Sequence, residues 1–453
     1  MFQSIDPYTQ KVISTFEPFS SAELNAAIEE STKAFHLWKL FSYKERSLLF
    51  LKMAELLRKN QEQYAHLITT EMGKIIKESK AEIEKCAWLC EYYAKNTEEL
   101  LATEFIKSDA TKSYVQFDPM GIVYAIMPWN FPFWQVLRAA VPTMMAGNSM
   151  VLKHAPNVIG CAVAIETLFT EAGFPEKVFQ NLIIPIELSE QVIAHPAICG
   201  VTLTGSMQAG SAVAAQAGKH LKKSVMELGG SDPFIVLKDA DLNLACKTGI
   251  FSRMLNAGQV CISAKRFIVE EGIYDQFVEE QKKLLHNLKL GNPLSEETDM
   301  GPMAREDLLI TIENQVKKSV EMGAKVIIGG KRHKEGAWFY EPTLVTNVTT
   351  EMPLLTEETF GPVMVVIKAK NADEAIQIAN DSSMGLGASL WTKDLSLAEK
   401  LATKIDAGSV FINGMTKSDP RIPFGGIKQS GFGRELGSYG IKEFLNIKTI
   451  WVK

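Results

Sequence analysis

The chain has 453 residues, with 48 lysines and arginines, 53 aspartates and glutamates and a formal net charge of -5 at pH 7. Its 46% hydrophobic and 22% charged content is ordinary for globular proteins and excludes disordered, collagen-like and coiled-coil classes. The length predicts about two to four domains, which leaves room for a ligand site between them.

The charge distribution argues against nucleic acid and anionic membranes as partners, because basic and acidic residues are interspersed without long runs of one sign. The N-terminal segment lacks the basic and apolar regions of a signal peptide, and no uninterrupted apolar stretch approaches the roughly 18 residues of a membrane span. The 6 cysteines are too sparse for a disulfide scaffold. We therefore expect a cytoplasmic protein.

The first hundred or so residues favour helices. Between residues 21 and 106 apolar side chains recur close to every 3.6 positions, and Ser20 or Ser21 suits the N-cap of the first helix. From residue 112 the pattern alternates, turns at Asp118–Gly121 and runs into a Pro-Trp-Asn-Phe-Pro break. This succession predicts a hairpin leading to a buried strand.

Beyond this break, apolar strand-like runs alternate with helical stretches, which predicts a parallel sheet covered by helices and then a second α/β unit beyond residue 265. The expected strands lie at 149–155, 178–185, 198–205 and 232–239 in the first set, and at 266–272, 324–330, 362–369 and 409–414 in the second.

No metal site is expected. Cys86 and Cys90 lie four residues apart in a helical stretch, but no histidine or second cysteine pair accompanies them, so core packing is the preferred interpretation. None of the 7 histidines has the spacing of a metal-ligand set.

Three residues stand in surroundings suited to catalysis. Cys261 follows a glycine-containing turn and precedes a serine and two cations, which suits a thiolate nucleophile; a buried small side chain is the alternative. Glu227, before Gly229 and Gly230, is either a general base or a solvated loop carboxylate. Asn130, between two prolines, is either a preorganised oxyanion donor or a turn residue.

A further candidate is the Gly205–Ser206 turn, which joins an apolar run to a helical stretch. Backbone N–H groups at such a helix start can bind a phosphate, although an ordinary turn is the alternative.

Taken together, these motifs resemble the aldehyde dehydrogenase family over essentially the whole chain. The motifs, in family order, are PWNFP at 128–132, VLKHA at 151–155, LTGS at 203–206, MELGG at 226–230, GQVC at 258–261, EETFGPV at 357–363 and PFGGIKQSGFGRE at 423–435. The short N-terminus, ELGGSDPFIV, GQVCISAKRFIVEEG and GPMAR look most similar to bacterial succinate-semialdehyde dehydrogenases of the Sad type.

The resemblance implies a chemistry for each catalytic candidate. The Cys261 thiolate would add to the aldehyde carbonyl, and Asn130 with the Cys261 backbone N–H would stabilise the oxyanion. Hydride would pass from the thiohemiacetal to a nicotinamide, and Glu227 would activate the water that hydrolyses the thioester.

The resemblance also implies a cofactor cleft. Its expected residues are Lys153 at the adenosine ribose, Gly205 and Ser206 at the pyrophosphate, Glu358 at the nicotinamide ribose, and Phe360 and Trp129 beside them. Pro156 stands where many NAD-selective relatives carry a glutamate that repels a 2′-phosphate. We therefore expect NAD or NADP to be used, with NAD slightly favoured.

For the substrate, the resemblance implies a carboxylate held by Arg138, with Ser418 contacting the same carboxylate and Trp134 and Phe424 walling the pocket. A structural ion pair of Arg138 with a nearby acid is the alternative. Longer relatives place a second arginine six residues before the nucleophile, where this chain has Leu255, with Arg253 two residues earlier.

The expected fold is α/β, with a Rossmann-like cofactor domain (1–107 and 121–229), an α/β catalytic domain (230–425) and a small β oligomerisation element (108–120 and 436–453). Edge pairing through this element predicts a homodimer or homotetramer.

The expected activity is NAD(P)-dependent oxidation of succinate semialdehyde to succinate. Another small aldehyde such as glutarate semialdehyde is an alternative substrate, because one methylene changes binding by only about 1–3 kcal/mol. A cysteine hydrolase using Cys261 and Glu227, and a catalytically silent structural protein, are alternatives from other classes.

Overall fold

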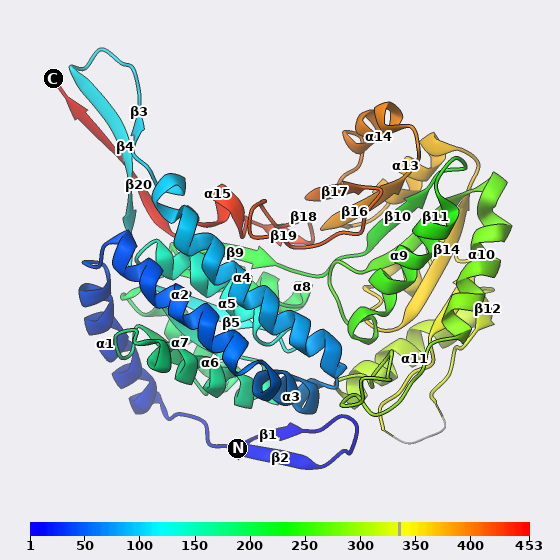
Figure 1. Ribbon diagram of the computed structural model, residues 1–453, viewed down its shortest axis with the longest axis horizontal. Coiled ribbons are helices and arrows are strands. Elements are labelled where there is room, and N and C mark those ends of the chain that lie inside the picture. Colours follow the sequence, from blue (N-terminus) through cyan, green and yellow to red (C-terminus); the bar gives the residue numbers. More distant parts are fainter. Residues whose placement is uncertain (334–336) are drawn as a thin grey trace.

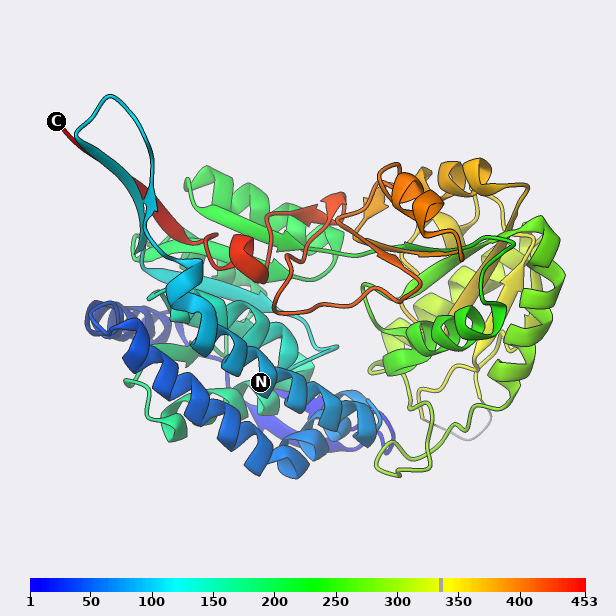
Figure 2. The ribbon, with the colours of Figure 1, turned by 45° about the horizontal axis from the view of Figure 1, so that its top comes forward.

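The computed structural model describes residues 1–333 and 337–453. Two helix-covered sheets lie in two parts of the molecule, and a small three-stranded sheet extends away from them beside the C-terminus (Figure 1). The same division is visible after a 45° turn (Figure 2).

The predicted N-terminal helices are confirmed. They are α1 (Ser21–Trp38), α2 (Tyr43–Lys59), α3 (Gln61–Met72) and α4 (Ile76–Leu100). Ser20 caps α1 in a capping box, because its hydroxyl accepts the Glu23 N–H while the Glu23 carboxylate accepts the Ser20 N–H. An antiparallel pair that was not predicted, β1 (Phe2–Ile5) and β2 (Val12–Phe16), precedes these helices.

The first large sheet has the strand order β19-β9-β8-β5-β6-β7, and all neighbours are parallel except β19 and β9. Its strands are β5 (Ile122–Met127), β6 (Ser149–His154), β7 (Phe179–Asn181), β8 (Ile198–Thr204), β9 (Lys223–Glu227) and β19 (Gly431–Phe432). The associated helices are α5 (Trp134–Met145), α6 (Ile159–Ala172), α7 (Ser189–Ala194) and α8 (Met207–Lys219), with 3-10 turns η1 (Pro156–Val158) and η2 (Ile186–Leu188).

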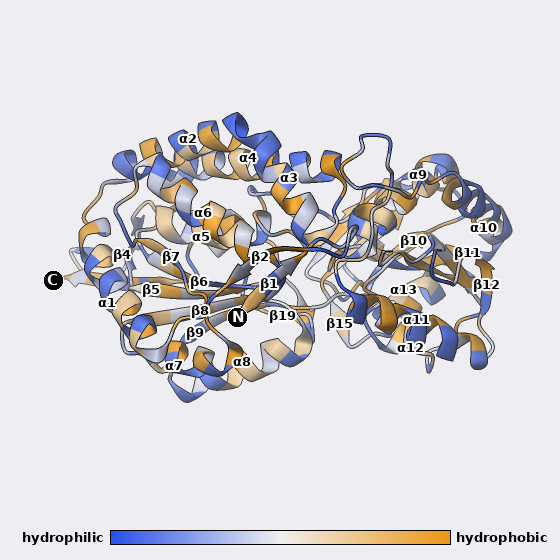
Figure 3. Cartoon of the chain, turned by 90° about the horizontal axis from the view of Figure 1, so that it is seen from below, coloured by the Kyte–Doolittle hydropathy of each residue, from blue (hydrophilic) through white to orange (hydrophobic). Residues whose placement is uncertain are grey.

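Both faces of this sheet are buried, which explains its continuous apolar strand runs. On one face Val123 and Ala125 pack in the cluster that contains residues of α2, α4, α5 and α6. On the other face Tyr124 packs with residues of α1, α7 and α8. Hydrophobic residues accordingly follow the strands, whereas hydrophilic residues cover the outer helix surfaces (Figure 3).

The second large sheet confirms the predicted second α/β unit. Its order is β12-β13-β14-β11-β10-β16-β17, and only β12 and β13 pair antiparallel. Its strands are β10 (Asp232–Val236), β11 (Ala264–Glu270), β12 (Lys325–Ile328), β13 (Thr343–Thr346), β14 (Val363–Ala369), β16 (Gly387–Trp391) and β17 (Ser409–Ile412). The helices with it are α9 (Leu242–Met254), α10 (Glu271–His286), α11 (Glu306–Glu321), α12 (Pro353–Thr356), α13 (Ala372–Asn380) and α14 (Leu395–Ala402).

The remaining elements are short. They are η3 (Leu255–Gly258), the antiparallel pair β15 (Met384–Gly385) and β18 (Ile427–Lys428), and α15 (Gly437–Gly440). Within the described residues, no helix is both long and apolar enough to span a membrane.

The small sheet corrects the predicted hairpin. Strand β4 (Lys112–Pro119) pairs antiparallel with β3 (Glu104–Phe105) and with β20 (Leu445–Val452), whereas β5 belongs to the first large sheet. The chain does turn after Pro119, but the strands on either side of that turn do not pair. The domain roles assigned from the sequence stay predictions.

Substitution of a single tryptophan tests the packing of the helices on the first sheet. Trp38 is fully buried, donates its indole N–H to the Met144 carbonyl at 3.0 Å and packs against Phe174. We expect Trp38→Ala to lower the free energy of unfolding by about 3–5 kcal/mol because it leaves a cavity and an unpaired carbonyl. Urea unfolding followed by circular dichroism measures this change.

The neighbouring residue provides the control. Leu37 is 61% exposed, so Leu37→Ala should change the unfolding free energy by no more than about 0.5 kcal/mol. Equal effects of the two substitutions would contradict the packing described here.

Candidate active site

Two cavities meet at Cys261. The first, here the cleft cavity, has a volume of about 370 Å³. It is lined by Pro128, Trp129, Asn130, Gln135, Thr204, Gly205, Ser206, Leu228, Gly229, Cys261, Arg305, Leu308, Glu358 and Phe360.

The second, here the inner cavity, has a volume of about 110 Å³. It is lined by Lys85, Phe131, Trp134, Gln135, Arg138, Ser252, Leu255, Val260, Cys261, Ile262, Ser263, Met415, Thr416, Lys417, Ser418 and Phe424. The thiol-bearing residue therefore faces one space on each side.

The structure thus gathers most of the residues singled out from the sequence. The cleft cavity brings together Trp129, Asn130, Gly205, Ser206, Glu358 and Phe360 with Cys261. The inner cavity brings together Trp134, Arg138, Ser418 and Phe424 with Cys261. Lys153 lines a separate small hollow together with Pro156, and Glu227 lines none of these spaces.

The turn that precedes Cys261 has an unusual backbone. After α9, Asn256 and Ala257 have φ angles of 53° and 52°, in the left-handed region that side chains other than glycine disfavour. Gly258 follows with φ 75°, and a Cβ there would lie 2.2 Å from the Gly361 carbonyl oxygen. Only glycine fits at this position, which accounts for the glycine in the GQVC motif.

Hydrogen bonds from distant segments hold this turn. The Asn256 N–H donates to the Glu78 carboxylate of α4 at 2.9 Å, and the Asn256 side-chain amide donates to the Asn130 carbonyl at 2.9 Å. The buried Gln259 donates through Nε2 to the Asn256 carbonyl at 3.0 Å, and its Oε1 accepts the Ala304 N–H at 3.0 Å. Gln259 belongs to the GQVC motif, but its position in the motif does not indicate that it braces the turn.

The same bonds orient the predicted oxyanion donor. Asn130 follows β5 and is buried, and its Nδ2 donates to the Gln259 carbonyl at 3.0 Å. Since a side-chain amide nitrogen carries two hydrogens, one remains for a ligand in the cleft cavity. This arrangement suits a preorganised donor to a developing negative charge.

The Cys261 thiol is weakly acidic in this setting. Burial raises its pKa to about 11, and the positive charges of Arg138 and Lys265 oppose that increase. The Lys265 ammonium donates to the Cys261 carbonyl and to the Glu358 carboxylate, both at 2.8 Å. This lysine, which the sequence analysis passed over, therefore connects the nucleophile loop to a predicted cofactor residue.

Glu227 ends β9 but turns away from the cavities. Its Oε1 would lie 2.7 Å from a Cβ built at Gly425, and among the described residues neither carboxylate oxygen has a hydrogen-bond partner. Burial, and then the negative charge of Glu435, raise the pKa of Glu227 well above the ordinary carboxyl range. The solvated loop carboxylate considered from the sequence is wrong, because Glu227 is buried.

Arg138, on α5, forms a buried ion pair with Glu435. Its guanidinium also donates to the Thr204 hydroxyl at 3.2 Å and lies 4.7 Å from the centroid of the Phe424 ring. The ion pair named as the alternative for Arg138 is therefore present. Because Arg138 also lines the inner cavity, its role as a carboxylate anchor stays a prediction.

Arg253 does not supply the second arginine of longer relatives. It is fully buried and donates to the carbonyls of Val363 and Thr359 at 2.7 and 2.9 Å, and to the Ser263 hydroxyl at 2.8 Å. These bonds tie the nucleophile loop to the second sheet. Leu255 lines the inner cavity instead.

The cleft cavity fits a dinucleotide. Ser206 caps α8, its hydroxyl accepting the Ala209 N–H at 3.2 Å, and Gly205 and Ser206 line the cavity, so the N-terminus of α8 begins at its wall. Gly229 leaves room beside Glu358, whose carboxylate would lie 2.4 Å from a Cβ at position 229. Trp129 and Phe360 pack edge to face at 5.9 Å.

No metal centre competes with this description. Within residues 1–333 and 337–453, no group of three or more histidine, cysteine, aspartate or glutamate side chains is placed to hold a metal ion. Cys86 and Cys90 are both fully buried in the core of the first unit.

The acidity of Cys261 gives a pH-dependent prediction for the protein without cofactor. With a thiol pKa near 11, the thiolate fraction rises about tenfold per pH unit below that value. The rate of Cys261 alkylation by iodoacetamide should therefore increase about tenfold per unit between pH 7 and 9, as followed by mass spectrometry of the modified peptide. A plateau near pH 7 would show instead a thiolate already formed. Cys261→Ala is the control: it lacks this thiol, so the mass of the alkylated peptide must be absent from it.

Comparisons with known proteins agree with this geometry. The sequence model of the aldehyde dehydrogenase family matches residues 1–450. A probable succinate-semialdehyde dehydrogenase [NADP(+)] from Synechocystis is 46% identical over 449 residues, covering 99% of each chain. A succinate-semialdehyde dehydrogenase [NADP(+)] from Mycobacterium avium is 45% identical, covering 99% of this chain and 96% of the other.

A solved structure has the same fold over its whole length. The succinic semialdehyde dehydrogenase of Streptococcus pyogenes, in complex with NADP+, aligns over 100% of both chains with a TM-score of 0.98 and 37% identity. With a nucleophile candidate between two cavities, an amide donor beside it and this full-length similarity, the chain belongs to the aldehyde dehydrogenase family.

Proposed function

We propose that this protein oxidises succinate semialdehyde to succinate with a nicotinamide dinucleotide, using Cys261 as nucleophile. The observation that carries the proposal is the position of Cys261 between the cleft cavity and a small inner cavity that contains cationic side chains. The full-length relatives named for succinate semialdehyde support the choice of substrate.

In this mechanism the Cys261 sulfur adds to the aldehyde carbon and forms a thiohemiacetal. The free hydrogen of the Asn130 amide and the Cys261 backbone N–H donate to the oxyanion. The residues of the cleft cavity would hold a nicotinamide dinucleotide, which would supply the acceptor for the hydride whose loss turns the thiohemiacetal into a thioester. Because the Gln259 carbonyl already fixes Asn130, little reorganisation is needed as the charge develops.

Glu227 is the proposed base for thioester hydrolysis. In this role its carboxylate turns from Gly425 toward the thioester, and that movement breaks no side-chain hydrogen bond within the described part of the chain. The raised pKa makes the ionised carboxylate a stronger base toward water.

For the cofactor, we propose that both NADP and NAD are accepted, with Lys153, Gly205, Ser206, Glu358, Phe360 and Trp129 in the roles given above. The relatives named above are described with NADP+, and they lend no support to the slight preference for NAD expected from the sequence. Pro156 carries no charge to repel a 2′-phosphate, and the nearby Lys153 ammonium attracts one.

Production of reduced nicotinamide tests this function. Purified protein should oxidise succinate semialdehyde with NADP and with NAD, and faster than it oxidises butanal. A higher rate with glutarate semialdehyde would make that aldehyde the preferred substrate. Ester hydrolysis without cofactor would favour the cysteine hydrolase. Cys261→Ala should lower kcat at least about a thousandfold, whereas Cys199→Ala, which lies outside both cavities, should retain the rate.

We further propose that the small sheet joins subunits. Strand β20 has β4 on one side and no strand on the other within the described residues, and Ile447 and Trp451 on it are 58% and 50% exposed. An unpaired edge with apolar side chains suits pairing with a second copy of the chain.

Light scattering of the purified protein tests the interface. The native chain should behave as a dimer or tetramer, and the double variant Ile447→Glu/Trp451→Glu should shift it toward a smaller species because like charges would meet at the edge. The exposed Leu221→Glu, on a loop after α8, is the control and should leave the mass unchanged. A monomeric native protein would end this proposal.

A further inference from the structure

A cation without an anionic partner lies in the wall of the inner cavity. Lys85, on α4, donates from its ammonium to the Ser418 hydroxyl at 2.8 Å, and the same ammonium lies 4.0 Å from the centroid of the Trp134 ring. No carboxylate of the described residues lies within ion-pair distance of it. Burial lowers the pKa of Lys85 to about 8, with Arg138 adding to that decrease.

The other charged groups around Lys85 are already paired. Glu82, one turn earlier on α4, forms a buried ion pair with Lys74, and its second oxygen accepts the N–H groups of Phe133 and Trp134 at 2.9 Å. Asp419, beside Ser418 in the chain, is paired with Arg421 at 2.6 Å. A buried charge is costly unless it is paired, so Lys85 lacks the partner that these groups have.

Two other buried cations of the site are also paired, Arg138 with Glu435 and Lys265 with Glu358. Lys417 also lines the inner cavity, but it is exposed, so solvent screens its charge. Lys85 therefore leaves the inner cavity with a net positive charge that no described side chain compensates.

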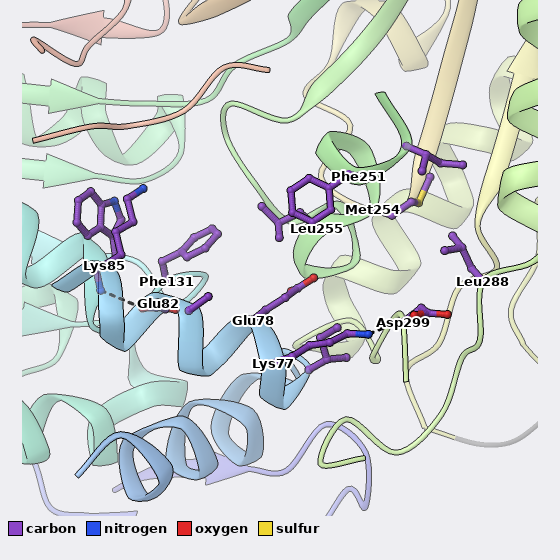
Figure 4. A pocket seen from close by; sticks show the side chains of 14 residues that line it. Lys77, Glu78, Glu82, Lys85, Phe131, Phe251, Met254, Leu255, Leu288 and Asp299 are labelled. Carbon is purple, nitrogen blue, oxygen red and sulfur yellow. Dashed lines mark hydrogen bonds and ion pairs between the residues drawn. The ribbon is translucent and has the colours of Figure 1, made fainter. Parts of the chain in front are cut away.

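Lys85 also lies between the inner cavity and a third cavity that opens beside it. A third space, here the outer cavity, has a volume of about 480 Å³ and shares Lys85, Phe131, Trp134 and Leu255 with the inner cavity. Figure 4 shows Lys77, Glu78, Glu82 and Lys85 along α4, with Phe251, Met254 and Leu255 across the outer cavity. Lys85 thus lies where the outer cavity meets the inner one.

Three acids line the outer cavity, and two of them are neutralised, Glu82 by Lys74 and Asp299 by Lys77. The third, Glu78, is about half ionised at neutral pH. Burial raises the pKa of Glu78 to about 7, and one of its oxygens already accepts the Asn256 N–H. A negatively charged substrate in the outer cavity therefore meets two paired acids and a partly protonated one before it reaches Lys85.

We infer that Lys85 and Ser418 together bind the carboxylate of the substrate, while Cys261 at the other side of the inner cavity receives its aldehyde. This inference rests on the proposed function. The Lys85 ammonium has donors left after its bond to Ser418, and the Ser418 hydroxyl, which accepts from Lys85, keeps its own hydrogen to donate. Two donors therefore converge on one carboxylate, and Arg138 stays with Glu435.

The inference is tested with two aldehydes that differ at one end. Succinate semialdehyde ends in a carboxylate where butanal ends in a methyl group. Lys85→Met should lower kcat/KM for succinate semialdehyde about ten- to a hundredfold, mainly through KM, because a charge-assisted bond is lost. The value for butanal should change less than about twofold. Ser418→Ala should show a smaller loss of the same selectivity, and Lys85→Arg should recover part of it.

Lys80→Met is the matched control. Lys80 lies on the same helix, is paired with Glu62 and Glu296 at 3.0 and 2.9 Å, and lines neither the outer nor the inner cavity. Its substitution removes the same charge and should leave both aldehydes unaffected. Equal losses for both aldehydes in Lys85→Met, or a selective loss only in Arg138→Gln, would overturn the inference. The second result would assign the carboxylate to Arg138.

A binding measurement separates this inference from the proposed reaction. Butyrate, but not butyramide, should slow Cys261 alkylation in the native protein, and Lys85→Met should abolish that protection. Protection that depends on Lys85, in a protein that does not oxidise succinate semialdehyde, would refute the proposed function and keep the carboxylate site. Protection that survives in Lys85→Met, or its absence in the native protein, would refute the site.

Discussion

The active site depends on the hydrogen bonds among Asn130, Asn256 and Gln259. Asn130 follows a strand of the first sheet, whereas the other two lie in the turn after α9, which packs on the second sheet. The turn holds two consecutive left-handed residues, each of which costs about 1–3 kcal/mol. The bonds to both sides of the turn offset this cost. They also fix the loop of Cys261 relative to the Asn130 amide, although the two residues come from segments that belong to different sheets.

Charge pairing then divides the space around Cys261. Toward the cleft cavity, Lys265 is neutralised by Glu358, and toward the inner cavity, Arg138 is neutralised by Glu435. In a buried setting an unpaired charge acts strongly on whatever enters, because little solvent screens it. Lys85 is such a charge. It makes the inner cavity electrically positive, although Phe131 and Trp134 in the cavity wall are apolar.

The local pattern of the chain predicted the strands of the large sheets better than the pairing within the small one. Strands β5, β6 and β8 are buried on both faces, so their apolar runs identify them without knowledge of their partners. The alternating pattern of β4 specifies a half-buried strand but not its neighbour. Its main partner, β20, lies at the far end of the chain, so the local pattern suggested a hairpin with the next apolar run. Residues 108–120 and 436–453 were grouped only in the expected oligomerisation element.

The sequence by itself determined the family and singled out Cys261, Asn130 and Ser206 as candidate site residues, because motifs are short segments whose order along the chain is visible. Only the tertiary structure decided that Glu227 turns toward Gly425, that Arg138 is paired with Glu435 and that Lys85 is not paired. The physical reason is that burial and charge pairing depend on distances between side chains remote in sequence. Periodicity gives the face of a helix on which Lys85 lies, but not the cavity that this face borders.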